Sequence, residues 1–436
     1  MSEILDPTPV AHAGVHVAES PLPEPERLRK SLVFALLLSQ LGIAVPAVGM
    51  FVVSFPLTIA ALDPDGKANS LSLLTGLYAV IGILISPVAG VLSDRCTSRF
   101  GMRKPFLLGG GLLAVSAMVV MGLATNYPVL LLGALAYAAG TGIYTGGSAA
   151  LVPDQVPERH RGKIMGLNQV MTGLGGVIAS VALPLFIGNQ FLVFVVPAIF
   201  MTVSTTVVLL VVRDRHLRSD EVTGSADLRG LFSQFKVNPR AIPDYSWAWI
   251  GKAITTLGTV LTTVYGIYFL TDKLEIAPEN LGGVITTVSL LGLATSIGGA
   301  LIGSWISDRF KMRKKMVLYT SLLIAVGAVI SAFAPDLNVY LIGAAIMGLG
   351  SGAYFPVDGA LMIDVLPGQG KESGKYMGLM TLADQVPRSV GPFLAAGVLA
   401  AGALTPGFSG YSLVFLAGGL IAIIGGLLVR LVKGSH

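Results

Sequence analysis

Four ionisable residues interrupt the long apolar stretches of this sequence, and they are the side chains most able to do chemistry. A charge at the centre of a membrane helix costs ~2.5–3.5 kcal/mol on insertion scales, so such groups normally pair or face a water-filled cavity. Proton relays and ion pathways are built from side chains of this kind. The sequence therefore predicts a charge network made of Lys252, Asp358, Asp384 and Arg388.

Sequence spacing suggests how these four charges pair. Asp384 and Arg388 are four residues apart with the acid first, which is the favoured order for an ion pair on one helix face. Lys252 and Asp358 each lie ~9–12 Å along a helix from its inner end, so we expect both in the inner third of the membrane. For Asp384 and Arg388, a buried structural pair is the alternative to a functional role.

Other reactive side chains are poorly placed for catalysis. All histidines lie outside the apolar stretches, and Cys96 has no second cysteine with which to form a disulfide or a metal site. We therefore expect no metal, no cofactor and no enzymatic activity. The histidines are His12, His16, His160, His216 and His436.

The elements that carry the charges are expected to be membrane-spanning helices. Hydrophobic residues make up 53% of the chain and charged residues 12%, a balance outside the range of soluble domains. Apolar stretches of roughly 20 residues suffice to cross a hydrocarbon core about 30 Å thick. We predict an all-α membrane protein of about 12 helices, at residues 31–60, 69–93, 104–124, 127–152, 162–187, 191–212, 245–271, 281–306, 315–334, 337–365, 374–400 and 409–432.

The distribution of basic residues predicts the orientation of these helices. If both termini face the cytoplasm, only Lys67 and Lys273 remain for the outer loops. This asymmetry is typical of the positive-inside rule, so the pI of 9.2 favours a lipid bilayer over nucleic acid as partner. We expect an integral protein of a bacterial cytoplasmic membrane.

The longest interior connection separates six helices from six. We expect a disordered cytoplasmic tail over residues 1–30, six-helix bundles over 31–212 and 245–432, and a cytoplasmic linker over 213–244. A short amphipathic helix on the inner membrane surface is predicted from one apolar linker face, formed by Leu228, Leu231, Phe232 and Phe235. An ordinary solvated linker is the alternative.

An internal repeat relates the two groups of helices. Residues 140–157 align with 350–367 at a constant offset, and the loop residues 93–95 match 307–309. Both copies run in the same direction, an arrangement known for carriers whose site lies between two rocking halves.

The repeat also shows that the buried charges belong to one half. The first copy has Ser148, Thr172 and Gly176 at the positions of Asp358, Asp384 and Arg388 respectively. Since the first half is expected to fold with these neutral residues, the charges favour a role in function over a role in the fold.

The loop between the second and third predicted helices resembles a family signature. From Gly90 to Lys104 it reads G-V-L-S-D-R-C-T-S-R-F-G-M-R-K, which resembles the loop signature of the major facilitator superfamily. The resemblance covers residues 31–432, and the segment C-T-S-R-F-G is similar to the sucrose symporters and the related glycoside-pentoside-hexuronide cation symporters. It implies a cavity lined by the first, fourth, seventh and tenth helices, and this puts Lys252 and Asp358 on the cavity.

The resemblance also implies a gate. In this superfamily the acid and basic residues of the loop take part in a latch between charges and a helix end that closes the cytoplasmic side. Loop charges that only set the orientation are the alternative. The gate residues implied here are Gly90, Asp94, Arg95 and Arg103 with the repeated Asp308, Arg309 and Arg313.

Two departures argue against the coupling routes of that sugar branch. The second helix has no acid before Asp94, and Ala138 stands where sucrose symporters carry a membrane-embedded aspartate. Core packing is the alternative role for each tyrosine among the remaining cavity candidates. These candidates are Gln40, Tyr144, Asn168, Gln169, Tyr265, Tyr268 and Tyr354.

The leading hypothesis is a secondary active transporter that works by alternating access and acts as a monomer. It would move a small neutral or weakly polar solute, such as a sugar or glycoside, by proton-coupled symport, with Asp358 as the titrating group and Lys252 as its counter-ion. A proton-coupled exporter of amphipathic or hydrophobic compounds is the second hypothesis. A polytopic membrane enzyme lacks a catalytic cluster, and a channel would need a ring of selective groups.

Overall fold

The structure of the chain is a computed structural model that describes residues 29–214, 216–217, 239–240, 242–367, 373–404 and 409–433. These residues are predominantly helical, and none of them forms a β-strand. Most of the predicted tail, and the amphipathic helix predicted in the linker, lie outside the described residues.

The helices form two groups, one before and one after the linker. The first half contains α1 (Lys30–Gly49), the π-helical turn η1 (Met50–Ser54), α2 (Phe55–Leu62), α3 (Lys67–Ser93), α4 (Lys104–Gly122), α5 (Tyr127–Ala149), α6 (Leu151–Gln155), α7 (Glu158–Ala182), η2 (Leu183–Phe186) and α8 (Gln190–Val211). The second half contains α10 (Pro243–Val264), α11 (Gly266–Tyr268), the π-helical turn η3 (Phe269–Lys273), α12 (Pro278–Phe310), α13 (Arg313–Ala332), α14 (Leu337–Asp364), α15 (Ser373–Ala403), α16 (Gly410–Leu428) and η4 (Val429–Leu431).

Helix length and hydropathy confirm the predicted membrane fold. Within the described ranges, 10 helices are long and apolar enough to cross a membrane, and the bent pair of α10 with α11 and η3 adds an eleventh span. Helix α15 is 31 residues long, well beyond the roughly 20 residues that a span needs. The described helices therefore accommodate the predicted set of about 12.

Several helices begin at a residue suited to that place. The side chains of Asn126, Asn189, Asp336 and Ser409 each accept a hydrogen bond from a backbone N–H in the first turn of α5, α8, α14 and α16. Such caps satisfy donors that have no partner within the helix. Asn126 and Asp336 cap helices that the internal repeat relates, so the repeat extends to local structure.

The first helix of each half is interrupted near one end. In the first half the π-turn η1 directly precedes α2, where Pro56 cannot donate a backbone hydrogen bond. In the second half α10 ends at Val264 and a second π-turn follows Tyr268. Neither helix is therefore a straight rod, and both breaks lie at the end where the halves meet.

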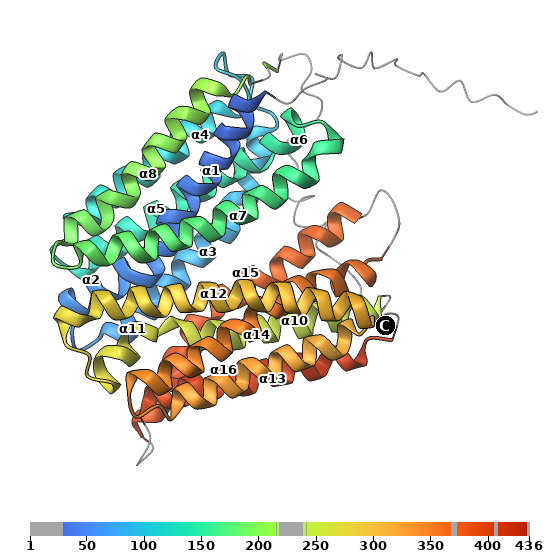
Figure 1. Cartoon of the computed structure of the whole chain (residues 1–436). Coiled ribbons are helices and arrows are strands. Elements are labelled where there is room, and N and C mark those ends of the chain that lie inside the picture. Colours follow the sequence, from blue (N-terminus) through green and yellow to red (C-terminus); the bar gives the residue numbers. More distant parts are fainter. Residues whose placement is uncertain are drawn as a thin grey trace, which may run out of the picture.

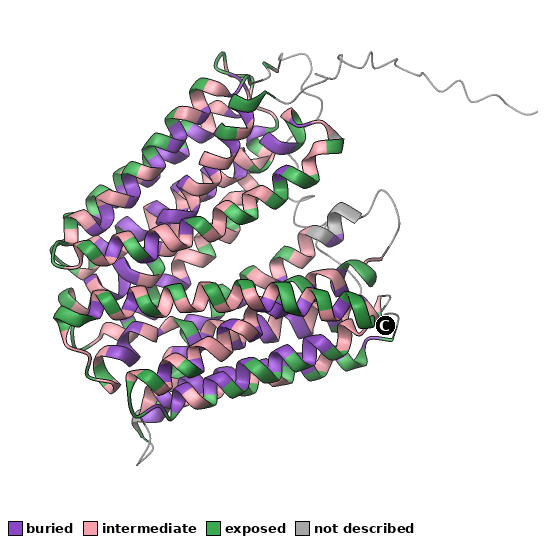
Figure 2. Cartoon of the chain, in the orientation of Figure 1, coloured by how far each residue is buried: buried purple, intermediate pink, exposed green. Residues whose placement is uncertain are grey.

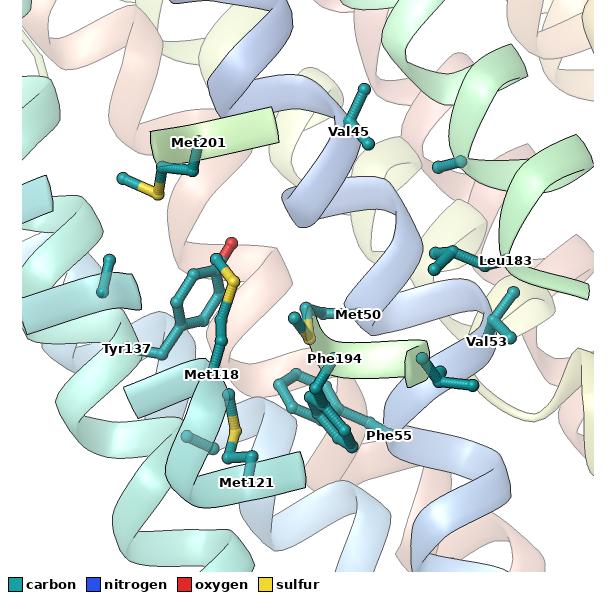
Figure 3. Packing of buried hydrophobic residues seen from close by; sticks show 14 of the residues in the cluster. Val45, Met50, Val53, Phe55, Met118, Met121, Tyr137, Leu183, Phe194 and Met201 are labelled. Atoms are coloured by element: carbon teal, nitrogen blue, oxygen red, sulfur yellow. The ribbon is translucent and has the colours of Figure 1, made fainter. Parts of the chain in front are cut away.

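Large apolar side chains fill the interior of the first half (Figure 3). Phe55 of α2 and Phe194 of α8 lie with ring centroids 6.4 Å apart, and Met50, Met118 and Met121 belong to the same buried cluster. Figure 2 shows buried residues concentrated inside each half and exposed ones along its outer faces. The same cluster continues into the second half through Tyr265, Tyr268 and Phe269, so the two halves share a buried apolar contact.

The two halves meet at one end of the molecule and diverge toward the other (Figure 1). They touch through the helix pairs α3–α15 and α7–α12. Near α2 and α11, the Tyr268 hydroxyl donates to the Pro56 carbonyl at 3.0 Å, and Tyr265 and Ser72 share a hydrogen bond of 2.5 Å between their hydroxyls. We call this end the closed end and the opposite one, which carries the loop between α3 and α4, the open end.

Candidate functional site

Three charged residues from three helices of the second half are in contact within the bundle. Lys252 of α10 donates through Nζ to Asp358 Oδ2 of α14 at 2.9 Å, and the same Nζ lies 3.3 Å from Asp384 Oδ1 of α15. The side chains of Lys252 and Asp358 are 3% and 0% exposed, whereas that of Asp384 is 31% exposed. We call these three residues the charged triad; only one of its carboxylates is open to solvent.

The triad carries a net charge of −1 when all three groups are ionised. Buried charges are tolerated only when they are paired and hydrogen-bonded. The single positive charge of Lys252 neutralises only one of the two carboxylates. One additional proton would make the triad neutral. A proton is therefore the smallest ligand that completes its charge balance.

One face of Asp358 is lined by polar atoms without partners. Asp358 Oδ1, the Tyr354 hydroxyl and the Thr255 hydroxyl are buried and have no hydrogen-bond partner among the described residues. The Tyr354 hydroxyl interacts electrostatically with the Asp358 carboxylate and with Thr255. A protonated Asp358 could donate where the carboxylate can only accept, so these neighbours suit a group that gains and loses a proton.

The expected ion pair between Asp384 and Arg388 does not form. Asp384 is directed toward α10, where it meets Lys252 and lies 3.5 Å from the Thr256 hydroxyl. Arg388 is exposed and makes no ion pair or hydrogen bond with a described residue. A spacing of four residues only permits a pair worth a few tenths of a kcal/mol, and Lys252 offers Asp384 a more enclosed partner.

The first half has a neutral counterpart of the triad. Gln40 of α1 donates to the Thr172 hydroxyl of α7 at 2.9 Å, and Ser39 and Tyr144 share a hydrogen bond of 3.0 Å. Ser148, the counterpart of Asp358, bonds only to its own helix at the Thr145 carbonyl. The described contacts therefore reproduce the helix arrangement of the second half without its charges.

The structure does not bring the cavity candidates together on an accessible surface. Tyr144 and Tyr354 are buried inside their own halves, and Tyr265 and Tyr268 are buried at the closed end. Their rings fill gaps between helices and their hydroxyls mostly find protein partners, as buried tyrosines usually do. Gln40 and Asn168 are partly buried and only Gln169 is exposed.

The loop signature forms a compact charge cluster in the first half. Arg103 pairs with Asp94 at 2.5 Å and with Asp154 at 3.1 Å, and it donates to the Ser93 hydroxyl at 2.6 Å. Asp214, which follows α8, accepts from the backbone N–H groups of Arg103 and Lys104 at the start of α4. These contacts tie α3, α4, α6 and the segment after α8 together at the open end.

The second copy of the signature is looser. Arg313 pairs with Asp364 at 2.5 Å but lies 3.6 Å from Asp308, and its side chain is 30% exposed against 5% for Arg103. Arg309 is exposed and Arg95 is partly buried. Gly90 faces α5, where Gly146 packs closely against α3. The described ion pairs of Arg103 and Arg313 each lie within one half.

A polar seal at the closed end was not anticipated from the sequence. Lys67 of the first half pairs with Asp272 of the second at 2.7 Å, and Asp272 also accepts from the Tyr411 hydroxyl at 2.6 Å. The Lys67 ammonium lies 5.2 Å from the centre of the Tyr268 ring. The only sequence signal for this seal was that Lys67 is a basic residue in an outer loop that otherwise has none.

Comparison with known proteins places this geometry in a family. The Major Facilitator Superfamily model matches residues 32–392 and 249–435. A structure of a bacterial homologue of the human lysosomal transporter Spinster, inward-facing and unoccupied, aligns with a TM-score of 0.67 at 16% identity over 93% of this chain and 96% of that one. At this level of identity the structural likeness shows the fold alone.

Two relatives of known activity are similar to different extents. The sucrose transport protein SUC3 of Arabidopsis thaliana is 35% identical over 91 residues, which cover 17% of this chain and 15% of that protein. The multidrug efflux pump Tap of Mycolicibacterium fortuitum is 22% identical over 402 residues, 86% of this chain and 91% of that protein. The match to the curated sugar transporters spans only 7% to 15% of their length.

The family match extends over most of both helix bundles, and the fold agrees with it. The resemblance inferred from the loop signature is thereby confirmed. This chain is an integral membrane transporter, not an enzyme, and it belongs to the major facilitator superfamily.

Proposed function

We propose that this transporter is a proton-coupled secondary carrier in which the charged triad binds the coupling proton. The observation that carries the proposal is the burial of Lys252 between two carboxylates, because the net charge of −1 becomes zero when one proton binds. The half-exposed Asp384 offers a route for the proton, and the enclosed Asp358 a place to hold it. The neutral first half supports a role for these charges beyond folding.

Alternating access supplies the second part of the proposed cycle. The halves meet at the closed end through Lys67 and Asp272 and diverge at the open end. Rocking about the α3–α15 and α7–α12 contacts would break this seal and bring the gate residues Asp94 and Arg103 toward the other half. Asp94 pairs with Arg103 of its own half and is still exposed, so it stays open to a partner from the other half.

We propose a small polar solute as the transported substrate, with sugars and glycosides as the first class to test. The partial similarity to sugar transporters supports this class. An exporter of amphipathic compounds is the second candidate, favoured by the similarity to Tap along most of the chain. Both candidates fit a carrier that acts as a monomer in a bacterial cytoplasmic membrane.

The test is proton-driven accumulation in sealed vesicles containing the purified transporter, with a panel of sugars, glycosides and hydrophobic cations. We expect Asp358→Asn to abolish accumulation driven by a proton gradient and to retain exchange of solute, because exchange needs binding and rocking but no proton release. The matched control is Ser148→Asn, which places the same side chain at the repeated position of the first half. The coupling role is wrong if Asp358→Asn still accumulates solute under a proton gradient.

The proposed orientation has a separate test. Both termini should lie in the cytoplasm because the open end carries the basic loops. In a background with Cys96→Ser, a cysteine at position 67 or 273 should react with a membrane-impermeant thiol reagent added outside. Reaction only from the inside would reverse the orientation.

A further inference from the structure

Arg388 lies near the middle of α15 and is a cation without a partner among the described residues. It follows the first residue of α15 by a rise of about 22 Å in a helix about 46 Å long, at 1.5 Å per residue. Its side chain is exposed and forms no ion pair or hydrogen bond with any residue that the structure describes. A guanidinium at this depth cannot face acyl chains without a large cost, so it must face water or a polar ligand.

Arg388 belongs to a polar stripe on one face of α15. Thr381, Gln385 and Arg388 follow one another at spacings of four and three residues, which places them on one side of the helix. All three side chains are exposed. The exposed apolar residues Val386 and Val390 lie on a different side. Helix α15 therefore has a polar face, formed by the stripe, and a separate apolar face suited to lipid or to the neighbouring half.

The neighbours of α15 place this stripe at the boundary between the halves. Helix α15 packs against α10 of its own half and against α3 of the other half. Phe393, close to Arg388 in sequence, lies directly over Gly76 of α3. The exposed stripe therefore lies on a helix that forms part of the contact between the halves.

The positive charge of Arg388 is not cancelled by its surroundings. Asp384, the nearest acid on α15, is already engaged by Lys252 and lies toward α10. In the first half the repeated position is Gly176, which adds neither charge nor bulk. Lys252, the other deep cation, is enclosed by two carboxylates. Arg388 is thus the accessible positive charge at this depth among the described residues.

We propose that Arg388, with Gln385 and Thr381, binds an oxyanion group of the transported solute: a carboxylate, phosphate or sulfate. A guanidinium presents parallel N–H groups that match two oxygens of such a group, while the amide and hydroxyl add single hydrogen bonds. The proposal rests on the proposed carrier function, since a site between the halves binds what the carrier moves. It narrows the polar solutes to those that carry an acidic group.

The test is equilibrium binding to the purified full-length protein in lipid nanodiscs. The probes are glucose, glucuronate and glucose 6-phosphate, with inorganic sulfate and phosphate, all at constant ionic strength set with chloride. Binding is followed by calorimetry and by the rise in unfolding temperature. We expect at least one oxyanion to bind about tenfold more tightly than glucose, because a charge-assisted bidentate contact is worth about that factor.

Three variants identify the residue responsible. Arg388→Gln should remove the preference for the oxyanion. Arg388→Lys should keep part of it, because the lysine ammonium keeps the positive charge but lacks the two parallel N–H donors of the guanidinium. Arg430→Gln removes an exposed arginine far along the chain at η4 and should leave the preference unchanged. A wild-type protein that no probe oxyanion stabilises overturns the proposal, as does an Arg388→Gln protein that keeps the preference, or an equal loss in Arg430→Gln.

These outcomes are separable from those of the proposed coupling. Equilibrium binding requires neither a proton gradient nor rocking, so it does not depend on Asp358 acting as the coupling group. If Asp358→Asn still accumulates solute while Arg388→Gln loses oxyanion preference, the coupling role fails and the binding site stands. The reverse pattern removes the oxyanion site and leaves the coupling role in place.

Discussion

The two halves of this transporter place different chemistry on the same helix arrangement. In the first half α1 joins α5 and α7 through Ser39–Tyr144 and Gln40–Thr172, with neutral groups throughout. In the second half α10 approaches α14 and α15 at the repeated positions, but Lys252, Asp358 and Asp384 replace neutral residues. Gly42 and Gly258 support this alignment, since each lets its helix pack closely against the last helix of its half.

This difference shows which features the fold requires. Leu36 lies three residues before Ser39, as Lys252 lies three residues before Thr255, and Leu36 is buried without needing a partner. A bundle of this type therefore forms with an apolar residue at the position of the lysine. Burying these charged groups costs desolvation free energy in the second half only. A cost confined to one half is better explained by function than by folding.

The largest expected effect comes from removing the lysine alone. Lys252→Met leaves two carboxylates without a counter-ion, one of them wholly buried, and should destabilise the protein by about 3–5 kcal/mol. Thermal unfolding of the detergent-purified protein measures this loss. The matched change in the first half, Leu36→Met, should cost less than about 1.5 kcal/mol because the volume is nearly conserved.

A double variant decides whether the comparison of the halves is sound. Lys252→Met combined with Asp358→Ser removes the enclosed lysine and the wholly buried carboxylate and leaves only the partly exposed Asp384 charged, so most of the lost stability should return. Proton-driven accumulation should stay absent. A double variant as unstable as Lys252→Met alone would mean that the two halves tolerate neutral residues differently.

At the open end we expect a smaller difference in stability between the halves, and here the first half should lose more than the second. Arg103 is buried but its two acids, Asp94 and Asp154, are exposed, so Arg103→Gln should cost about 2 kcal/mol through the loss of charge-assisted hydrogen bonds. Arg313 is more exposed and one of its acids is distant, so Arg313→Gln should cost about 1 kcal/mol. Unfolding temperatures of the two variants, measured side by side, test this order. Equal losses would show that the second cluster is as tightly held as the first.

Much of the fold could be predicted from the sequence because lipid imposes few solutions. Twenty-residue apolar stretches must become helices, and the repeated loop around Asp94 and Asp308 indicated both the family and its two halves. The meeting of Lys252 with Asp358 could be anticipated because each is too costly to leave alone in its helix. These inferences rest on the energy of burial, which depends on residue type and not on exact geometry.

The details of the site depend on how each helix is rotated about its axis, which could not be predicted from the sequence pattern. Asp384 can reach Arg388 on its own helix or Lys252 on α10, and only the packing of α15 against α10 selects the lysine. The tyrosines carry polar tips that suit either a cavity or a core, and Tyr265 and Tyr268 belong to the contact between the halves. The seal of Lys67 with Asp272 joins residues far apart in sequence, so the isolated basic residue in an outer loop did not reveal its partner.

The smallest expected effect concerns the two repeated tyrosines. The Tyr144 hydroxyl shares a buried hydrogen bond with Ser39, whereas the Tyr354 hydroxyl is buried without a partner in the described residues. Tyr144→Phe should therefore cost about 1–2 kcal/mol, since it leaves Ser39 unsatisfied, while Tyr354→Phe should change stability by less than about 0.5 kcal/mol. Thermal unfolding of both phenylalanine variants provides the measurement. A loss in Tyr354→Phe as large as in Tyr144→Phe would mean that this hydroxyl is bonded in solution, and the two halves would then differ in charge but not in hydrogen bonding at this position.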